Sequence, residues 1–121
     1  MKIIIADDSS FIRSMITKAV KSNFEDIEII SCTDGKQAFD AYCEHKPDFL
    51  ITDLLMPEMT GQQLLAKLKS ENYNAKAIVI SADIQTATRA ELTEIGILEF
   101  INKPLTADKL SLLVDLIKSM R

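Results

Sequence analysis

The sequence contains little of what disulfide-stabilised folds or histidine-based sites require. It has 121 residues, with no tryptophan, two cysteines and one histidine. Cys32 and Cys43 form no CxxC pair, and one falls in a strand pattern and the other in a helix pattern, so we expect two reduced and largely packed thiols. His45 precedes Lys46 and Pro47 at a predicted helix end, where it caps the helix or faces solvent. We therefore expect no histidine-kinase or histidine-phosphotransfer role for it.

The charge balance and the short apolar runs argue against two classes of partner. The net charge is -4 and the isoelectric point is near 4.9, which disfavours a nucleic acid or an anionic membrane as the main partner, because both require a cationic face. No apolar stretch approaches the ~20 residues that span a bilayer. The segment 1–8 is too short for a signal peptide and enters the fold at once. We expect a cytoplasmic protein that binds neither nucleic acid nor membrane.

Glycine and proline are also scarce, with three of each, and no linker, low-complexity tract or repeat is visible. Neither GxGxxG nor the GxxxxGKS/T pattern occurs, which argues against a nucleotide-binding protein because the glycine-rich phosphate cradle is missing. Apolar residues make up 47% of the chain and charged residues 26%, as in an ordinary globular protein with a real core. We interpret residues 1–121 as one domain.

Short apolar runs alternate with helical patterns along the whole chain. The runs predict strands, and they lie at residues 2–6, 28–32, 49–52, 77–80 and about 100–101. A helical pattern follows each run, the last one over about residues 106–120. Strict alternation indicates an α/β fold, a doubly wound, five-stranded parallel sheet with helices on both faces. Right-handed connections favour the flavodoxin-like strand order 2-1-3-4-5, and the polar run 28–32 suits an edge strand.

Polar side chains follow four of these runs at the point where each one ends. Asp7 and Asp8 follow the first strand, Asp53 the third, Ser81 the fourth and Lys103 the fifth. Ligands of open α/β sheets bind outside the carboxyl ends of the strands, so these side chains should converge on one rim. Clustered carboxylates hold a cation, and a lysine with a serine suits an anion. The pattern favours a site for a divalent metal and a phosphoryl group together.

These motifs resemble the receiver domain of two-component response regulators, the CheY-like group. The resemblance spans the chain, and its specificity comes from the order of the motifs, each at a strand end. The motifs are Asp7-Asp8, Asp53, Met56-Pro57-Glu58-Met59-Thr60-Gly61, Ser81-Ala82 and Lys103-Pro104. Receiver domains have the strand order 2-1-3-4-5, so the resemblance supports that order as much as the connection rules do.

The resemblance implies a phosphoacceptor site. Asp53 would accept a phosphoryl group from a histidine kinase, and Asp8, Asp53 and the backbone carbonyl of Leu55 would ligate Mg²⁺, which prefers oxygen ligands and keeps several waters. Asp7 would act mainly through a bound water. Lys103 would contact a phosphoryl oxygen as a point charge. Such a reaction depends on positioning and charge neutralisation more than on covalent assistance.

The resemblance also implies a switch. Ser81 would hydrogen-bond the phosphoryl group and draw the loop after its strand inward, and Phe100 would rotate into the space that the loop leaves. Many relatives carry tyrosine in place of Phe100, so a hydroxyl for partner contacts is missing here. The alternative for Phe100 is an ordinary core aromatic. The Lys103-Pro104 bond is a candidate cis peptide, as in relatives.

Two positions depart from the best-known relatives. Leu55 is apolar where some relatives carry a side chain that hydrogen-bonds water, so an attacking water lacks support and we expect slow spontaneous loss of the phosphoryl group. Asp83 adds a negative charge two residues after Ser81, with an effect on hydrolysis whose sign the sequence leaves open.

The favoured interpretation is a single-domain response regulator, a phosphoacceptor signalling protein rather than an enzyme, which assists its own phosphorylation and dephosphorylation. Its expected partners are a histidine kinase and a downstream protein, such as a flagellar motor switch in chemotaxis or another effector, with a phosphatase in some systems. A phosphorelay intermediate and a receiver-like binding module that is never phosphorylated are the alternatives. A haloacid-dehalogenase-type phosphatase requires a second aspartate where Leu55 stands.

Overall fold

The computed structural model describes residues 1–82 and 85–121, and of Thr86 and Ala87 only the backbone. Its centre is a five-stranded sheet in the order β2-β1-β3-β4-β5, and each neighbouring pair is parallel. The strands are β1 (Lys2–Ala6), β2 (Glu28–Cys32), β3 (Phe49–Thr52), β4 (Ala77–Ser81) and β5 (Glu99–Asn102). The predicted fold class and strand order are therefore confirmed.

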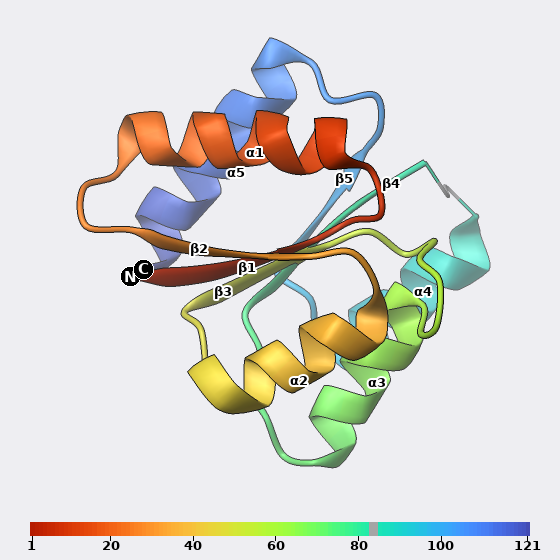
Figure 1. Ribbon diagram of the computed structural model, residues 1–121. Helices are drawn as coiled ribbons and strands as arrows, with labels where there is room; N and C mark the ends of the chain where they lie inside the picture. Colours follow the sequence, from red (N-terminus) through yellow and green to blue (C-terminus); the bar gives the residue numbers. More distant parts are fainter. Residues whose placement is uncertain (83–84) are drawn as a thin grey trace.

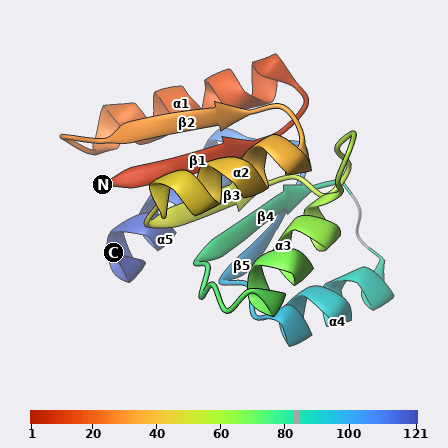
Figure 2. The same ribbon diagram turned by 60° about the horizontal axis from the view of Figure 1, so that its bottom comes forward.

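Helices cover both faces of the sheet, as Figures 1 and 2 show. The helices α1 and α5 lie on one face, and α2, α3 and α4 lie on the other (Figure 1). Their bounds are α1 (Ser10–Asn23), α2 (Gly35–His45), α3 (Gly61–Ser70), α4 (Thr86–Ile95) and α5 (Ala107–Met120). None of the helices among the described residues has the length and apolar character needed to cross a membrane.

The strands β1, β3 and β4 are mostly apolar because both of their faces are buried. In β1, Ile3 and Ile5 pack against α1 and α5, whereas Ile4 packs in the cluster of α2, α3 and α4. All four residues of β3 are buried, while β2 is half exposed. The half-exposed β2 lies at an edge of the sheet, as the polar run 28–32 predicts, and the buried β3 lies at its centre.

Side-chain caps fix where the helices begin, and so fix the loops at the carboxyl ends of the strands. The hydroxyl of Ser9 accepts a hydrogen bond from Ile12 N at the start of α1, at a distance of 3.3 Å. Thr60 and Gln63 form a reciprocal capping box at the start of α3. These caps satisfy otherwise unpaired backbone amides and hold the loops that follow β1 and β3.

The predicted boundaries differ from the observed ones by one or two residues. The strand β4 extends to Ser81, and β5 covers Glu99–Asn102 rather than two residues alone. The last helix begins at Ala107, because Thr106 is its N-cap and accepts from Lys109 N. The peptide bond between Lys103 and Pro104 is cis, as the resemblance suggests. Asp83 lies outside the described residues.

Candidate functional site

Three carboxylates meet at the carboxyl ends of β1 and β3. Asp7 and Asp8 follow β1, and Asp53 follows β3, the strand paired with β1. One ligand oxygen from each of the three lies within 4.8 Å of the others. Asp7 and Asp53 are buried, whereas Asp8 is exposed. The predicted convergence of these three residues is therefore observed.

Lys103 lies between two of these carboxylates. Its Nζ donates hydrogen bonds to Asp7 Oδ2 at 3.0 Å and to Asp53 Oδ2 at 2.9 Å. The lysine side chain is 20% exposed, and those of Asp7 and Asp53 are 3% and 7% exposed. Partly buried, charge-assisted bonds of this kind are stronger than surface ion pairs. The ammonium thus supplies the charge that lets two buried carboxylates lie close together.

Backbone groups aim the buried carboxylates. Leu54 N donates to Asp53 Oδ1 at 2.7 Å, and Ser9 N donates to Asp7 Oδ1 at 2.9 Å. The guanidinium of Arg13 donates to the backbone carbonyl of Asp7 at 2.7 Å. Arg13 was not anticipated from the sequence, although it lies one turn into the helix that follows the acidic pair. Asp7 and Asp53 therefore each have Oδ1 held by a backbone amide and Oδ2 bonded to the ammonium of Lys103.

The electrostatics of the cluster favour a cation. Burial raises the pKa of Asp7 above 3.8, although the Ser9 amide and Lys103 oppose that rise and Asp53 adds to it. Burial lowers the pKa of Lys103, but hydrogen bonds to Asp53 and Asp7 outweigh burial and leave its pKa above 10.5. The lysine is therefore charged at neutral pH. A further cation beside Asp7 and Asp8 would reduce the repulsion that remains among the carboxylates.

The loop after β3 approaches the start of α3 closely. Gly61 N donates to the carbonyl of Leu54 at 2.8 Å. A Cβ on Gly61 would lie 2.2 Å from the backbone oxygen of Asp53 and 2.8 Å from Leu54 Cα. Only glycine permits this approach, because the nearest atoms belong to the backbone. The loop also leaves Leu55 67% exposed.

The two expected switch residues lie on the neighbouring strands β4 and β5. Ser81 is fully buried at the end of β4, opposite Asn102 in the strand register, and its carbonyl accepts from Lys103 N at 3.0 Å. Phe100 is half-buried on β5 opposite Val79. The main-chain bond between Lys103 and Ser81 ties the end of β4 to the lysine that contacts both buried aspartates.

The residues present fit a hard divalent cation. All three candidate side-chain ligands are carboxylates, which Mg²⁺ and similar ions prefer. Asp8 is exposed, so the cluster opens to solvent on one side. A cation there and the ammonium of Lys103 would together offer positive charge to an incoming anion beside Asp53. The arrangement is suited to phosphoryl transfer onto a carboxylate.

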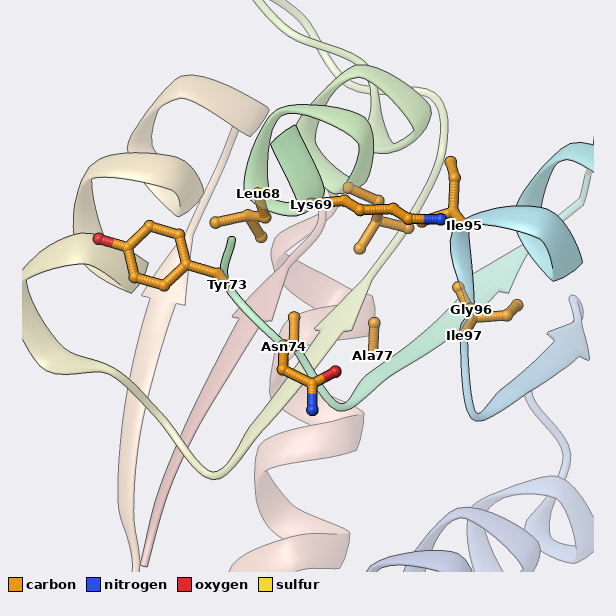
Figure 3. A pocket seen from close by; sticks show the side chains of 10 residues that line it. Leu68, Lys69, Tyr73, Asn74, Ala77, Ile95, Gly96 and Ile97 are labelled. Atoms are coloured by element: carbon orange, nitrogen blue, oxygen red, sulfur yellow. The ribbon is translucent and has the colours of Figure 1, made fainter. Parts of the chain in front are cut away.

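A separate pocket lies at the opposite end of the sheet and does not contribute to this site. It has a volume of about 100 Å³ and lies near the amino end of β4, where Tyr73, Asn74 and Ala77 line it together with Gly96 (Figure 3). Lys69 closes one side by donating to the carbonyl of Glu94 at 2.9 Å. None of the acidic residues described above lines it.

Comparison with known proteins agrees with this geometry. The family model described as "Response regulator receiver domain" matches residues 3–115. The chain is 36% identical over 110 residues to the chemotaxis protein CheY of Listeria monocytogenes, covering 90% of this chain and 91% of that protein. It is 37% identical to the chemotaxis protein CheY of Bacillus subtilis, covering 89% of each.

Solved structures give the same result. The N-terminal domain of an uncharacterised protein from Wolinella succinogenes is similar with a TM-score of 0.90 and 27% identity, over 100% of this chain and 94% of that chain. A CheX–CheY–BeF3–Mg complex from Borrelia burgdorferi contains a chain that is similar with a TM-score of 0.87 and 27% identity, over 98% of this chain and 87% of that chain. The strand order, the acidic cluster and these matches agree, and the chain belongs to the response regulator receiver domain family.

Proposed function

We propose that the protein is a single-domain response regulator in which Asp53 accepts a phosphoryl group from a histidine kinase. The observation that carries the proposal is the position of Asp53, buried at the end of β3 with Lys103 Nζ at 2.9 Å and two further aspartates beside it. A lone aspartate in a loop would have neither partner. Receiver domains are signalling proteins rather than enzymes, and membership of this family supports a role as a phosphorylation-dependent switch.

Each residue of the site has a chemical task in this proposal. An oxygen of Asp53 attacks phosphorus as the bond to the donor histidine breaks, and the imidazole keeps the electron pair. The ammonium of Lys103 shifts from the two carboxylates to contact a phosphoryl oxygen, and the hydroxyl of Ser81 donates a hydrogen bond to another phosphoryl oxygen. Asp8, Asp53 and the backbone carbonyl of Leu55 would hold Mg²⁺, and Asp7 would act through a bound water. The metal supplies charge neutralisation between the carboxylates and the phosphoryl oxygens.

The switch would carry the signal to a protein-binding face. In this proposal, Ser81 draws the loop after β4 toward the phosphoryl group, and Phe100 rotates into the space that becomes free. Phe100 is half-buried on the edge strand β5, where a change of ring position alters the surface between β5 and α4. Phosphorylation thereby changes what that surface binds.

The relatives suggest the partners. The chemotaxis names of the Listeria and Bacillus proteins favour chemotaxis as the pathway and a flagellar motor switch, or another effector, as the target. The Borrelia complex of CheX with CheY favours a separate protein that acts on the phosphorylated form, such as a phosphatase. A phosphorelay intermediate would instead pass the phosphoryl group to a second histidine. An effector-binding response regulator loses the phosphoryl group to water, whereas a phosphorelay intermediate loses it to another protein.

The proposal is tested by phosphorylation with a small donor. The purified protein is incubated with Mg²⁺ and acetyl phosphate, and its intact mass is recorded beside an Asp53→Asn variant and a sample with EDTA. We expect a gain of one phosphoryl group in the wild type with Mg²⁺ and none in the variant. No gain with acetyl phosphate, with phosphoramidate or with several histidine kinases would show that the protein is a binding module that is not phosphorylated.

The exposed Leu55 sets a second expectation, for the lifetime of the phosphorylated state. Its side chain is at the rim of the site and offers no hydrogen bond to an attacking water. Leu55→Asn should speed spontaneous dephosphorylation on the order of 10-fold, less than the roughly 100-fold or more that a general base supplies, because the amide orients the water without taking its proton. The decay of phosphorylated protein after donor removal measures this rate. Leu55→Met is the control, and equal rates for all three proteins would refute the expectation.

A further inference from the structure

An arginine on α4 contacts the expected switch aromatic. The guanidinium carbon of Arg89 lies 5.0 Å from the centroid of the Phe100 ring. Arg89 is exposed, and Phe100 is half-buried. A guanidinium within about 6 Å of a ring centroid is attracted by the electrons of the aromatic face. The contact joins α4 to β5.

The surroundings leave Phe100 room to occupy more than one position. The Phe100 ring packs against the core cluster beneath α2, α3 and α4. Because β5 is an edge strand, only β4 lies beside it in the sheet. Beside it is a groove of about 140 Å³ between α4 and β5, lined by Arg89, Thr93 and Phe100 together with residues 97–99. A ring at the edge of such a groove is held less by packing than a ring in the core.

Within the described part of the chain, Arg89 forms no ion pair with a carboxylate. The ion pairs found among residues 1–82 and 85–121 involve His45 and Lys103, not Arg89. Glu99 lines the same groove, but its Oε1 accepts from Phe100 N at 2.9 Å, so this carboxylate is engaged with the backbone of β5. The guanidinium therefore interacts with the ring instead of a carboxylate.

We propose that Arg89 is a positioning residue that holds Phe100 in its half-exposed place and so opposes the phosphorylated conformation. The proposal rests on the proposed function, in which Phe100 turns inward on phosphorylation. A ring that turns inward leaves Arg89, so the contact stabilises only the unphosphorylated arrangement. A contact made in one of two states shifts the equilibrium toward that state and weakens every ligand of the other.

The expected size follows from the contact itself. A cation–π interaction at an exposed site corresponds to about a 2- to 5-fold change in an equilibrium constant. While the phosphorylated conformation is the minor one, its population and the apparent affinity for a phosphoryl mimic rise together by that factor when the contact is removed. A merely structural contact would lower the stability of both states equally and leave the affinity unchanged.

The test uses beryllofluoride, the phosphoryl mimic in the Borrelia complex, with Mg²⁺. The protein carries labelled phenylalanine, and NMR follows the Phe100 ring during a titration of wild type, Arg89→Met and Arg89→Lys. Arg89→Met keeps the length of the side chain but not its charge, and it should raise the apparent affinity about 2- to 5-fold. The apparent affinity of Arg89→Lys for beryllofluoride should lie between those of Arg89→Met and the wild type.

Lys67→Met is the matched control, because Lys67 Nζ lies 4.2 Å from the Phe39 ring and so pairs α3 with α2 rather than α4 with β5. It should leave the affinity unchanged. An Arg89→Met affinity equal to or below that of the wild type, with the Phe100 signals still shifting on binding, overturns the role of Arg89 alone. If beryllofluoride binds and the Phe100 signals stay in place, the switch role of Phe100 fails and the role of Arg89 fails with it. If beryllofluoride does not bind, the phosphoacceptor function itself is refuted.

Discussion

Replacing Lys103 with methionine should destabilise the protein and nearly abolish its phosphorylation. The ammonium donates to Asp7 at 3.0 Å and to Asp53 at 2.9 Å, and both carboxylates are buried. Removing one partner of a buried ion pair leaves uncompensated charge, so the free energy of unfolding at neutral pH without Mg²⁺ should fall by about 3 kcal/mol. Phosphorylation by acetyl phosphate should slow on the order of 100-fold or more, the usual effect of losing one group that stabilises transition-state charge.

The loss of stability should depend on pH in a definite direction. The pKa of Asp7 is raised above 3.8, chiefly by burial, so its ionisation disfavours the folded state once the pH rises through that value. Lys103 is one of the groups that lower this pKa, and the variant lacks it. Ionised Asp7 is therefore less favourable in the variant, and the difference from wild type should shrink as acid protonates it. The raised pKa of Lys103 means that its own contribution persists below 10.5 and disappears only in stronger base.

Urea unfolding at several pH values, with and without Mg²⁺, measures these effects. Lys109→Met is the control, because Lys109 Nζ donates to the carbonyl of Asn102 at 2.6 Å and pairs with neither aspartate. It should lose about 1 kcal/mol, the usual value of one hydrogen bond. Adding Asp7→Asn to Lys103→Met should recover part of the lost stability, as should Mg²⁺. Equal stabilities for Lys103→Met and Lys109→Met would contradict the account of the ion pair.

Most of the fold could be predicted because this sheet is buried on both faces. Apolar runs such as residues 49–52 cannot be placed at the surface, and polar residues directly after them mark the carboxyl ends of strands. Parallel strands bring those ends to one rim, which is why Asp7, Asp8, Asp53 and Lys103 were predicted to meet and do meet. The roles of these residues in phosphoryl transfer remain predictions.

The rest depended on geometry that residue types do not encode. No sequence pattern indicates that one lysine donates hydrogen bonds to two carboxylates at once, because the distances depend on how the loop after β5 is placed. The contact of Arg89 with Phe100 joins two elements whose relative position is set by tertiary packing. Boundaries also shifted where a cap decides them, since Thr106 serves as the cap of α5 rather than its first residue.

Replacing Gly61 with alanine should lower both the stability and the rate of phosphorylation, because Gly61 holds the loop after β3 against the start of α3. In Gly61→Ala the new Cβ would lie 2.2 Å from the backbone oxygen of Asp53, closer than any real contact. The loop must shift, and overpacking against backbone should lower the free energy of unfolding by about 3 kcal/mol. The shift also displaces Asp53 itself, and a misplacement of about 1 Å slows a reaction on the order of 100-fold. Urea unfolding and the acetyl phosphate reaction measure the two effects.

Gly96→Ala separates this effect from the general cost of replacing glycine. Gly96 has φ of 99°, at the end of α4, and apart from its chain neighbours no described residue comes within 4 Å of an added Cβ. Its replacement should cost about 1 kcal/mol of stability, because a side chain disfavours the left-handed region, and it should leave the phosphorylation rate unchanged. If Gly61→Ala also phosphorylates at the wild-type rate, Asp53 does not depend on the close approach of this loop. If only Gly61→Ala is slow, the same glycine that permits α3 to begin beside β3 also sets the position of the phosphoacceptor.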